Sequence, residues 1–239
     1  MTGLGAQKGH IMVVGAHAAD AELMAGGVVA HYTKQGYGAT LVHLTLGEKG
    51  HRTLSPEAYA RQKEDEARRA AKILGADARF LPYKDAELPV DDEVKYALCD
   101  LIREVKPTLI VTHWKGSIHK DHENTSYIVR DAIFYAALPT IKRDLPAHGC
   151  WRLFYAENWE DPYDFEVDTY VDISDAYDTW VEAIRQYELV SGHVSDFRYY
   201  DYYTALAVTR GCLSSHRYAE AFMSPRGALV RKGPGFPGF

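Results

Sequence analysis

Continuous apolar runs constrain the fold of this chain more than any other feature of its sequence. The three clearest runs occupy residues 10–16, 39–46 and 108–113. A short strand without polar alternation is typical of a sheet that is covered on both faces. Segments with apolar residues at helical spacing separate these runs, at residues 22–36, 55–74 and 91–105. Strands that alternate with helices predict an α/β fold, a three-layer sandwich with a Rossmann-like, mostly parallel sheet.

The second half of the chain has a less regular pattern. We expect further helices at residues 121–137, 175–190 and 197–210. We expect short strands at residues 78–81, 152–157, 169–173 and 218–223. Residues 225–239 hold several glycines and prolines, which predicts a tail or loop. Because the sequence shows no internal repeat and no interdomain linker, one domain over residues 1–239 is favoured.

The composition narrows the classes of function. The net charge is −6 with both signs interspersed, which argues against a nucleic-acid partner, since such binders carry a basic face. No run approaches the roughly 18 consecutive apolar residues of a membrane-spanning helix, so no membrane partner is expected. The three cysteines lie far apart and form no CxxC pair, which favours a cytoplasmic location. The 17 tyrosines cluster late and favour a homo-oligomer, because tyrosine is enriched at interfaces.

Ionisable residues follow two of the expected strands. Residues 16–22 read Ala-His-Ala-Ala-Asp-Ala-Glu, directly after the first strand. Residues 119–122 read His-Lys-Asp-His, in the loop after the strand that ends at His113. Ligand sites in open α/β sheets lie beyond the carboxyl ends of the strands, so we expect both segments at the same edge of the sheet.

These segments hold the residue types of a metal site. A catalytic zinc ion takes three protein ligands and leaves one position open for water, and His17, Asp20 and His122 supply such a set. Ligand type discriminates poorly between metals, so zinc is the first expectation and another divalent ion the alternative. A lone histidine at a strand end is more often a structural hydrogen-bonding group, and only the presence of two clusters favours the metal. His113 is compatible with lining a pocket or with supporting a ligand.

Several motifs together match a known family. They are Ala16-His17-Ala18-Ala19-Asp20-Ala21-Glu22, Gly26-Gly27, Arg61-Gln62-Lys63-Glu64, Leu74-Gly75 and His119-Lys120-Asp121-His122. With them, almost the whole chain resembles the LmbE-like, or PIG-L-like, deacetylases, which hydrolyse N-acetyl groups on amino sugars. The likeness is greatest to the bacillithiol-biosynthesis deacetylases, which share a late segment similar to Tyr218-Ala219-Glu220. The resemblance implies a zinc cofactor and a small-molecule amino-sugar substrate.

The resemblance also implies roles for individual residues. The three residues proposed above as metal ligands match the ligands of the family. His119 matches the residue that stabilises the oxyanion or protonates the leaving amine, and Asp121 matches the residue that orients His119 and tunes its charge. Arg61 and Asp85 match positions that hold sugar hydroxyls in relatives.

The chain departs from the family at position 19. The family carries an Asp there that acts as general base, whereas Ala19 transfers no proton. Loss of a positioned base costs about 10²–10⁴-fold in rate. Three explanations stay open. Another carboxylate, Glu48 or less readily Glu22, replaces the base; His119 serves as both base and acid; or the chain binds metal and sugar without hydrolysis. We expect N-acetyl hydrolysis, with a catalytically silent or altered binding protein as the alternative.

Overall fold

A mixed sheet forms the centre of the protein. The computed structural model describes residues 8–225, and within them seven strands form one sheet in the order β3-β2-β1-β4-β5-β7-β6. The strands are β1 His10–Gly15, β2 Gly38–His43, β3 Asp77–Phe80, β4 Leu109–Thr112, β5 Leu153–Ala156, β6 Thr169–Asp172 and β7 Ala219–Met223. The helices are α1 Asp20–Lys34, α2 Pro56–Leu74, α3 Asp92–Val105, α4 Lys120–Ala137, α5 Tyr177–Ile184 and α6 Tyr199–Ser214, with a 3₁₀ turn at Glu188–Ser191.

The strand order places a ligand site at the centre of the sheet. Strand β1 pairs in parallel with both β2 and β4, and β3 and β5 extend the parallel sheet on either side. Strand β7 runs antiparallel to its neighbours β5 and β6. The order reverses between β1 and β4, and ligands bind beyond the carboxyl ends of strands at such a switch point. The expected α/β fold with a mostly parallel sheet is confirmed.

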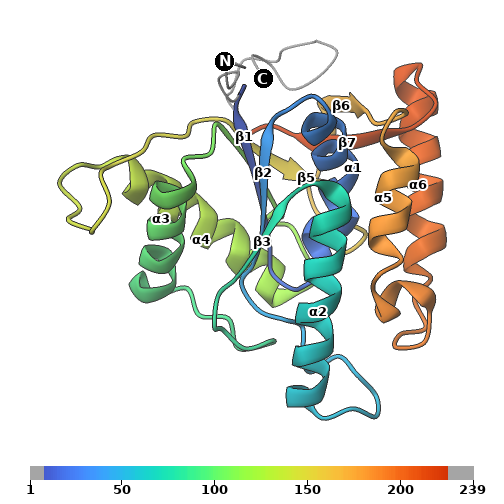
Figure 1. The fold of residues 1–239 in the computed structure, drawn as a ribbon, viewed down its shortest axis with the longest axis horizontal. Helices are drawn as coiled ribbons and strands as arrows, with labels where there is room; N and C mark the ends of the chain where they lie inside the picture. The colour runs from blue at the N-terminus through green and yellow to red at the C-terminus, as the bar shows by residue number, and fades with distance from the viewer. Residues whose placement is uncertain (1–7, 226–239) are drawn as a thin grey trace, which may run out of the picture.

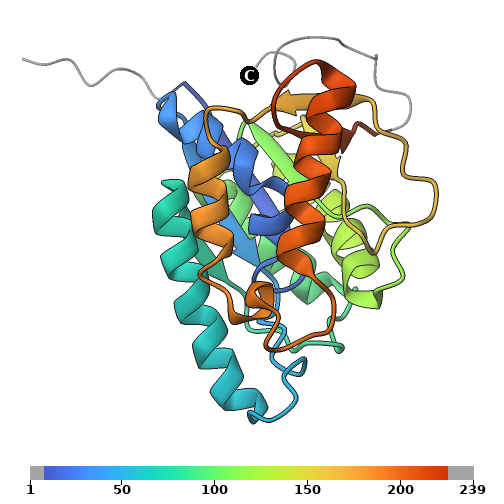
Figure 2. The same ribbon diagram turned by 90° about the vertical axis from the view of Figure 1, so that its right-hand side faces the viewer.

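Helices cover both faces of the sheet (Figure 1). Helices α3 and α4 lie on one face, and α1, α2, α5 and α6 lie on the other. Figure 2 shows α5 and α6 on the outside of this second layer, and α5 packs on α1 and α2. Alternate residues of β1 serve the two cores: Ile11 and Val13 pack under the larger helical layer, and Met12 and Val14 pack against α3 and α4. This double burial explains why the strand reads as a continuous apolar run.

Local signals set the ends of α2. The Ser55 hydroxyl oxygen accepts a hydrogen bond from the backbone N–H of Ala58 at 3.2 Å, and Pro56 occupies the first helical position. Gly75 ends the helix with φ of 72°, a conformation that glycine adopts without steric cost. The helix predicted to start at Ser55 and stop at Gly75 is therefore confirmed.

The helix predicted at residues 175–190 is too long. Helix α5 ends at Ile184, and the backbone of Tyr187 is extended. From there the Tyr187 hydroxyl donates a hydrogen bond of 2.8 Å to Oε1 of Glu22, a buried tertiary contact that the local sequence does not reveal. The tail expected after Pro225 lies outside the described residues. No helix in residues 8–225 is long and apolar enough to cross a membrane.

Candidate metal centre

Three side chains converge beyond β1 and β4. Nδ1 of His17 lies 3.1 Å from Oδ2 of Asp20, and Nε2 of His122 lies 3.3 Å from each of these atoms. A tetrahedral zinc ion with bonds of about 2.0–2.1 Å separates its ligand atoms by about 3.3 Å. The donor atoms therefore fit a zinc ion as they stand. His17 follows β1, Asp20 begins α1, and His122 lies in the first turn of α4.

Two carboxylates lie behind His17. Oδ1 of Asp85 is 3.3 Å and Oδ2 of Asp121 is 3.4 Å from Nε2, the nitrogen that faces away from the cluster. The backbone N–H of Ala86 donates to Asp121 at 2.7 Å and fixes that carboxylate. Carboxylates at the second nitrogen of a ligating histidine fix its tautomer and increase its basicity. Asp121 thus contacts His17 through its side chain, whereas it meets His119 through its backbone N–H.

His122 has a carboxylate partner of its own. Its Nδ1 lies 3.2 Å from Oε2 of Glu160, in the segment between β5 and β6. His113 stacks on the other side of this ring, with centroids 4.0 Å apart, and its Nε2 lies 3.2 Å from Oδ2 of Asp20. His113 is fully buried and is not among the residues that line the cavity. Of its two expected roles, the structure therefore favours support of the neighbouring Asp20 side chain over lining the pocket.

Burial and neighbouring charges shift the pKa values of the two histidines in the cluster. Burial alone lowers the pKa of His17, but the carboxylates of Asp20, Asp121 and Asp85 raise it well above its usual value. Burial lowers the pKa of His122 to about 3, so this imidazole is neutral. A neutral His122 with its proton on Nδ1, the nitrogen near Oε2 of Glu160, would present the lone pair of Nε2 to the cluster. A bound cation would displace the proton of His17, because metal and proton compete for a histidine ligand.

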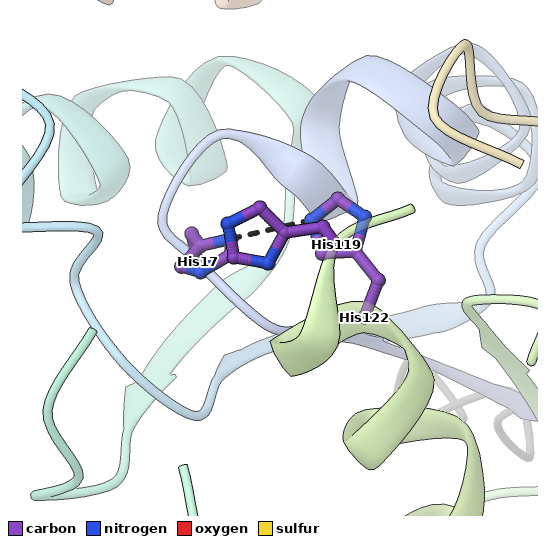
Figure 3. A group of neighbouring side chains, drawn as sticks. All are labelled: His17, His119 and His122. Atoms are coloured by element: carbon purple, nitrogen blue, oxygen red, sulfur yellow. Dashed lines mark hydrogen bonds between the residues drawn. The ribbon is translucent and has the colours of Figure 1, made fainter. Parts of the chain in front are cut away.

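His119 lies beside the proposed metal ligands His17 and His122. Its ring centroid lies 4.7 Å from that of His17 and 4.8 Å from that of His122. Figure 3 shows the three side chains next to one another. Nδ1 of His119 accepts a hydrogen bond of 3.2 Å from the backbone N–H of Asp121. The proton of the neutral ring is therefore on Nε2. Burial and the positive charge of His17 lower the pKa of His119, which favours this neutral form.

A cavity of about 240 Å³ opens over the cluster. His17, Asp20, His122, His119 and Asp85 line it, together with Glu160. Its aromatic wall comes from Tyr59, Trp159, Tyr199 and Tyr203. Burial and the charge of Asp20 raise the pKa of Glu160 to about 7. Such a cavity with a few convergent polar groups is typical of a site for a small molecule.

Three residues considered in the sequence analysis do not line this cavity, namely Ala19, Glu48 and Arg61. Ala19 is buried, has φ of 96°, and is absent from the cavity lining. Glu48 lies behind Asp85, where its Oε1 accepts a 3.0 Å hydrogen bond from the Asp85 backbone N–H. Arg61 is exposed on the outside of α2 and does not line the cavity.

Two residues of the site, Lys63 and Glu160, are not predicted from the sequence as site residues. The buried side chain of Lys63 lines the cavity from α2, two positions beyond Arg61. The spacing of Tyr59, Lys63 and Ala67 along one buried face of α2 is the signal that could have identified it. Glu160 lies in an irregular segment where no periodicity applies, so only the folded chain brings it to His122.

The chain is similar to known proteins over most of its length. The model of the PIG-L family, GlcNAc-PI de-N-acetylase, matches residues 12–133. A 4-oxalmesaconate hydratase from Pseudomonas putida is 26% identical over 209 residues, which cover 84% of this chain and 79% of that protein. A diacetylchitobiose deacetylase from Thermococcus kodakarensis is 26% identical over 224 residues, 88% of this chain and 80% of that protein.

A solved structure shows the same fold. The crystal structure of the 4-carboxy-2-hydroxymuconate hydratase from Pseudomonas putida KT2440 superposes with a TM-score of 0.85 at 24% identity. The match covers 94% of this chain and 99% of that one. The overall α/β architecture is thus shared with a protein that is described as a hydratase.

Proposed function

This chain belongs to the PIG-L family, and on that premise we propose that it is a metal-dependent N-deacetylase. The proposed reaction is hydrolysis of an N-acetyl group on a glucosamine-type sugar conjugate. One observation carries the proposal: three donor atoms 3.1–3.3 Å apart, from His17, Asp20 and His122, with the proton-bearing His119 beside them. The deacetylase from Thermococcus kodakarensis supports the reaction type.

The ligand set favours zinc, with another divalent ion as the alternative. Two imidazoles and one carboxylate suit zinc, which polarises a carbonyl group and activates water when bound. His17, Asp20 and His122 would hold the ion. The carboxylates of Asp85 and Asp121 orient His17 for this role, because both face its second nitrogen.

His119 is suited to donate rather than to accept a proton. Its Nδ1 is occupied by the Asp121 backbone N–H, so Nε2 carries the proton. In amide hydrolysis this N–H can stabilise the oxygen that gains negative charge. Delivery of a proton to the leaving amine nitrogen requires that His119 first be protonated on both nitrogens, so that a neutral ring remains afterwards. A role as base at Nε2 requires the other tautomer, with the proton on Nδ1 and without the hydrogen bond from Asp121.

Because Ala19 transfers no proton, we propose Glu48 as the residue that replaces the general base. Oε2 of Glu48 is buried and has no hydrogen-bond partner among the described residues. Its other oxygen holds the backbone of Asp85, which lines the cavity. Substitution of Glu48 by Gln separates the alternatives, since unchanged turnover excludes it as base. Because Arg61 is exposed on the outer face of α2, we propose it as a contact only for a substrate that extends to that face.

A hydration is the second candidate function. The hydratase from Pseudomonas putida matches 84% of this chain, a share similar to that of the deacetylase. Addition of water to a carbon–carbon double bond expels no amine. Unlike amide hydrolysis, it therefore needs no residue that protonates a leaving amine. A catalytically silent or altered protein that binds metal and sugar is the remaining alternative.

Paired assays decide between these functions. The zinc-loaded protein is incubated with N,N'-diacetylchitobiose, with release of primary amine as the readout, and with 4-oxalmesaconate, with loss of ultraviolet absorbance as the readout. Amine release above a His17→Ala control supports the deacetylase, and hydration without amine release replaces it by the second candidate. If the wild type shows neither activity and Ala19→Asp gains a large activity, the natural site is catalytically silent.

We also propose that the protein works in the cytoplasm as a homo-oligomer of single-domain subunits. The three cysteines are free, and two of them are buried, which is compatible with a reducing compartment. The aromatic side chains of Trp151 and Tyr163 are exposed and offer contact surface for a second copy. Gel filtration with light scattering tests the oligomeric state.

A further inference from the structure

Two carboxylates meet the same nitrogen of His17. Oδ1 of Asp85 lies 3.3 Å and Oδ2 of Asp121 lies 3.4 Å from Nε2 of this ring. The other histidine of the cluster, His122, meets one carboxylate at the corresponding nitrogen, that of Glu160. A single N–H makes one well-directed hydrogen bond, so one carboxylate is enough to orient a ligating histidine. The second carboxylate at His17 is therefore in excess of what orientation requires.

These two carboxylates are enclosed and held in place by the main chain. Asp121 is fully buried, and its Oδ1 has no hydrogen-bond partner among residues 8–225. Its Oδ2 accepts a hydrogen bond of 2.7 Å from the backbone N–H of Ala86. Oδ2 of Asp85 accepts one of 3.0 Å from the backbone N–H of Lys49. A buried, ionised carboxylate with an unpartnered oxygen is costly, which favours a cation beside it.

The lysines nearby have other partners. Nζ of Lys49 pairs with Glu87, and Lys63 divides its charge between Asp85 and three further carboxylates. One divalent ion in the cluster supplies two positive charges, whereas the carboxylates on the two sides of His17 carry three negative charges. A balance of charge therefore requires more positive charge on the Nε2 side of the ring.

The donor atoms on this side have the spacing of a metal site. His17, Asp85 and Asp121 each offer one ligand atom, and these three atoms all lie within 4.8 Å of one another. The two separations measured from Nε2, 3.3 Å and 3.4 Å, match the distance of about 3.3 Å between the ligand atoms of a tetrahedral zinc ion. His17 and Asp85 also line the cavity, so an ion reaches this place from solvent.

We propose that a second divalent cation binds between Nε2 of His17, Asp85 and Asp121, so that the imidazole of His17 bridges two metal ions. The proposal rests on the proposed function in that it shares His17 with the first site, formed by His17, Asp20 and His122. The second ion displaces the Nε2 proton, which leaves to solvent, and the ring then binds one ion through each nitrogen. Because this ion competes with a proton and lies near the first ion, it binds at higher free metal concentration. Two carboxylates and one imidazole suit zinc or manganese.

The number of bound zinc ions tests the proposal without any turnover. Equilibrium dialysis at graded free zinc concentrations is expected to give two plateaus for the wild type, at one and then two ions per chain. Asp85→Asn and Asp121→Asn are expected to level off at one ion, which binds about 10- to 100-fold more weakly because His17 loses support. His122→Ala removes a ligand of the first site alone and is expected to retain the ion at Nε2. Asp65→Asn, an exposed acid on α2, is the control and should bind two.

Anomalous diffraction from zinc-soaked crystals of the wild type locates the ions and decides the question if a variant does not fold. Two peaks are expected, one at each nitrogen of His17, with Asp85 and Asp121 beside the peak at Nε2. A wild type that levels off at one ion, or a second peak elsewhere on the surface, overturns the proposal. So does a second ion that survives both Asp85→Asn and Asp121→Asn. A peak at Nε2 without one at Nδ1 would instead contradict the proposed function, so the two failures are distinguishable.

Discussion

Nδ1 of His122 lies 3.2 Å from Oε2 of Glu160, so a carboxylate from the segment after β5 supports a residue that begins α4. The contact joins two parts of the chain that meet only in the folded protein. It completes a pattern in which both histidines of the cluster have a carboxylate at the nitrogen that faces away from the proposed metal.

Glu160→Gln is expected to weaken zinc binding by about 10- to 100-fold, because a neutral amide no longer makes His122 more basic or fixes its tautomer. Competition with a chromogenic chelator measures the affinity. Glu182→Gln, an exposed acid on α5, is the control and should bind zinc like the wild type. An unchanged affinity in Glu160→Gln would show that this contact does not support the metal site.

Ala19→Gly is expected to stabilise the fold by about 1 kcal/mol. Ala19 has φ of 96°, a region that costs a non-glycine residue about 1–3 kcal/mol, and glycine removes most of that cost while adding some chain entropy to the unfolded state. Urea denaturation of the metal-free protein measures the change. A lower free energy of unfolding in the variant would mean that contacts of the Ala19 methyl group outweigh the strain.

The sequence predicts the proposed metal ligands but only part of the side chains that contact them. The positions of His17, Asp20 and His122 can be predicted because each follows a parallel strand or lies in the first turn of the next helix, and parallel strands bring those ends to one edge of the sheet. Asp85 is predicted as a residue of the site, yet its contact with His17 depends on how a loop turns. Glu160 has no such regularity, because its segment has neither helix nor strand periodicity.

The error in the helix predicted at residues 175–190 has a physical origin. The run of helix-forming residues continues past Ile184, but Tyr187 leaves the helix and its hydroxyl reaches Glu22. This tertiary contact of one polar side chain decides where the helix ends, and local propensity does not contain the contact.

Gly27→Ala is expected to destabilise the protein by about 1–3 kcal/mol, the usual cost of an overpacked core. A Cβ atom at this position would lie 2.6 Å from Cδ1 of Ile173 and 2.8 Å from Oε1 of Glu220. Chemical denaturation measures the loss. The control is Gly50→Ala, whose added Cβ would meet its nearest neighbour at 3.5 Å. Equal stability of the two variants would mean that the core around Gly27 relaxes without cost.

Glu220 is expected to make the stability of the protein depend on pH. Its carboxylate accepts hydrogen bonds of 2.8 Å from the backbone N–H groups of Gly27 and Val28, but complete burial still raises its pKa from 4.5 to about 7. The folded protein therefore holds this proton to a higher pH than the unfolded chain does. Between pH 4.5 and pH 7 the folded state binds more protons, so the contribution of Glu220 to stability falls as the pH rises and levels off above pH 7.

Comparison with Glu220→Gln isolates this contribution, because the other titrating groups act equally in both proteins. The amide does not titrate, so a constant difference from its altered hydrogen bonds is expected at every pH. Superimposed on that constant, the wild type should lose stability relative to Glu220→Gln from pH 5 to pH 8, as measured by urea unfolding in buffers of equal ionic strength. A difference that stays flat across this range would show that the two backbone N–H donors keep the carboxylate ionised despite its burial.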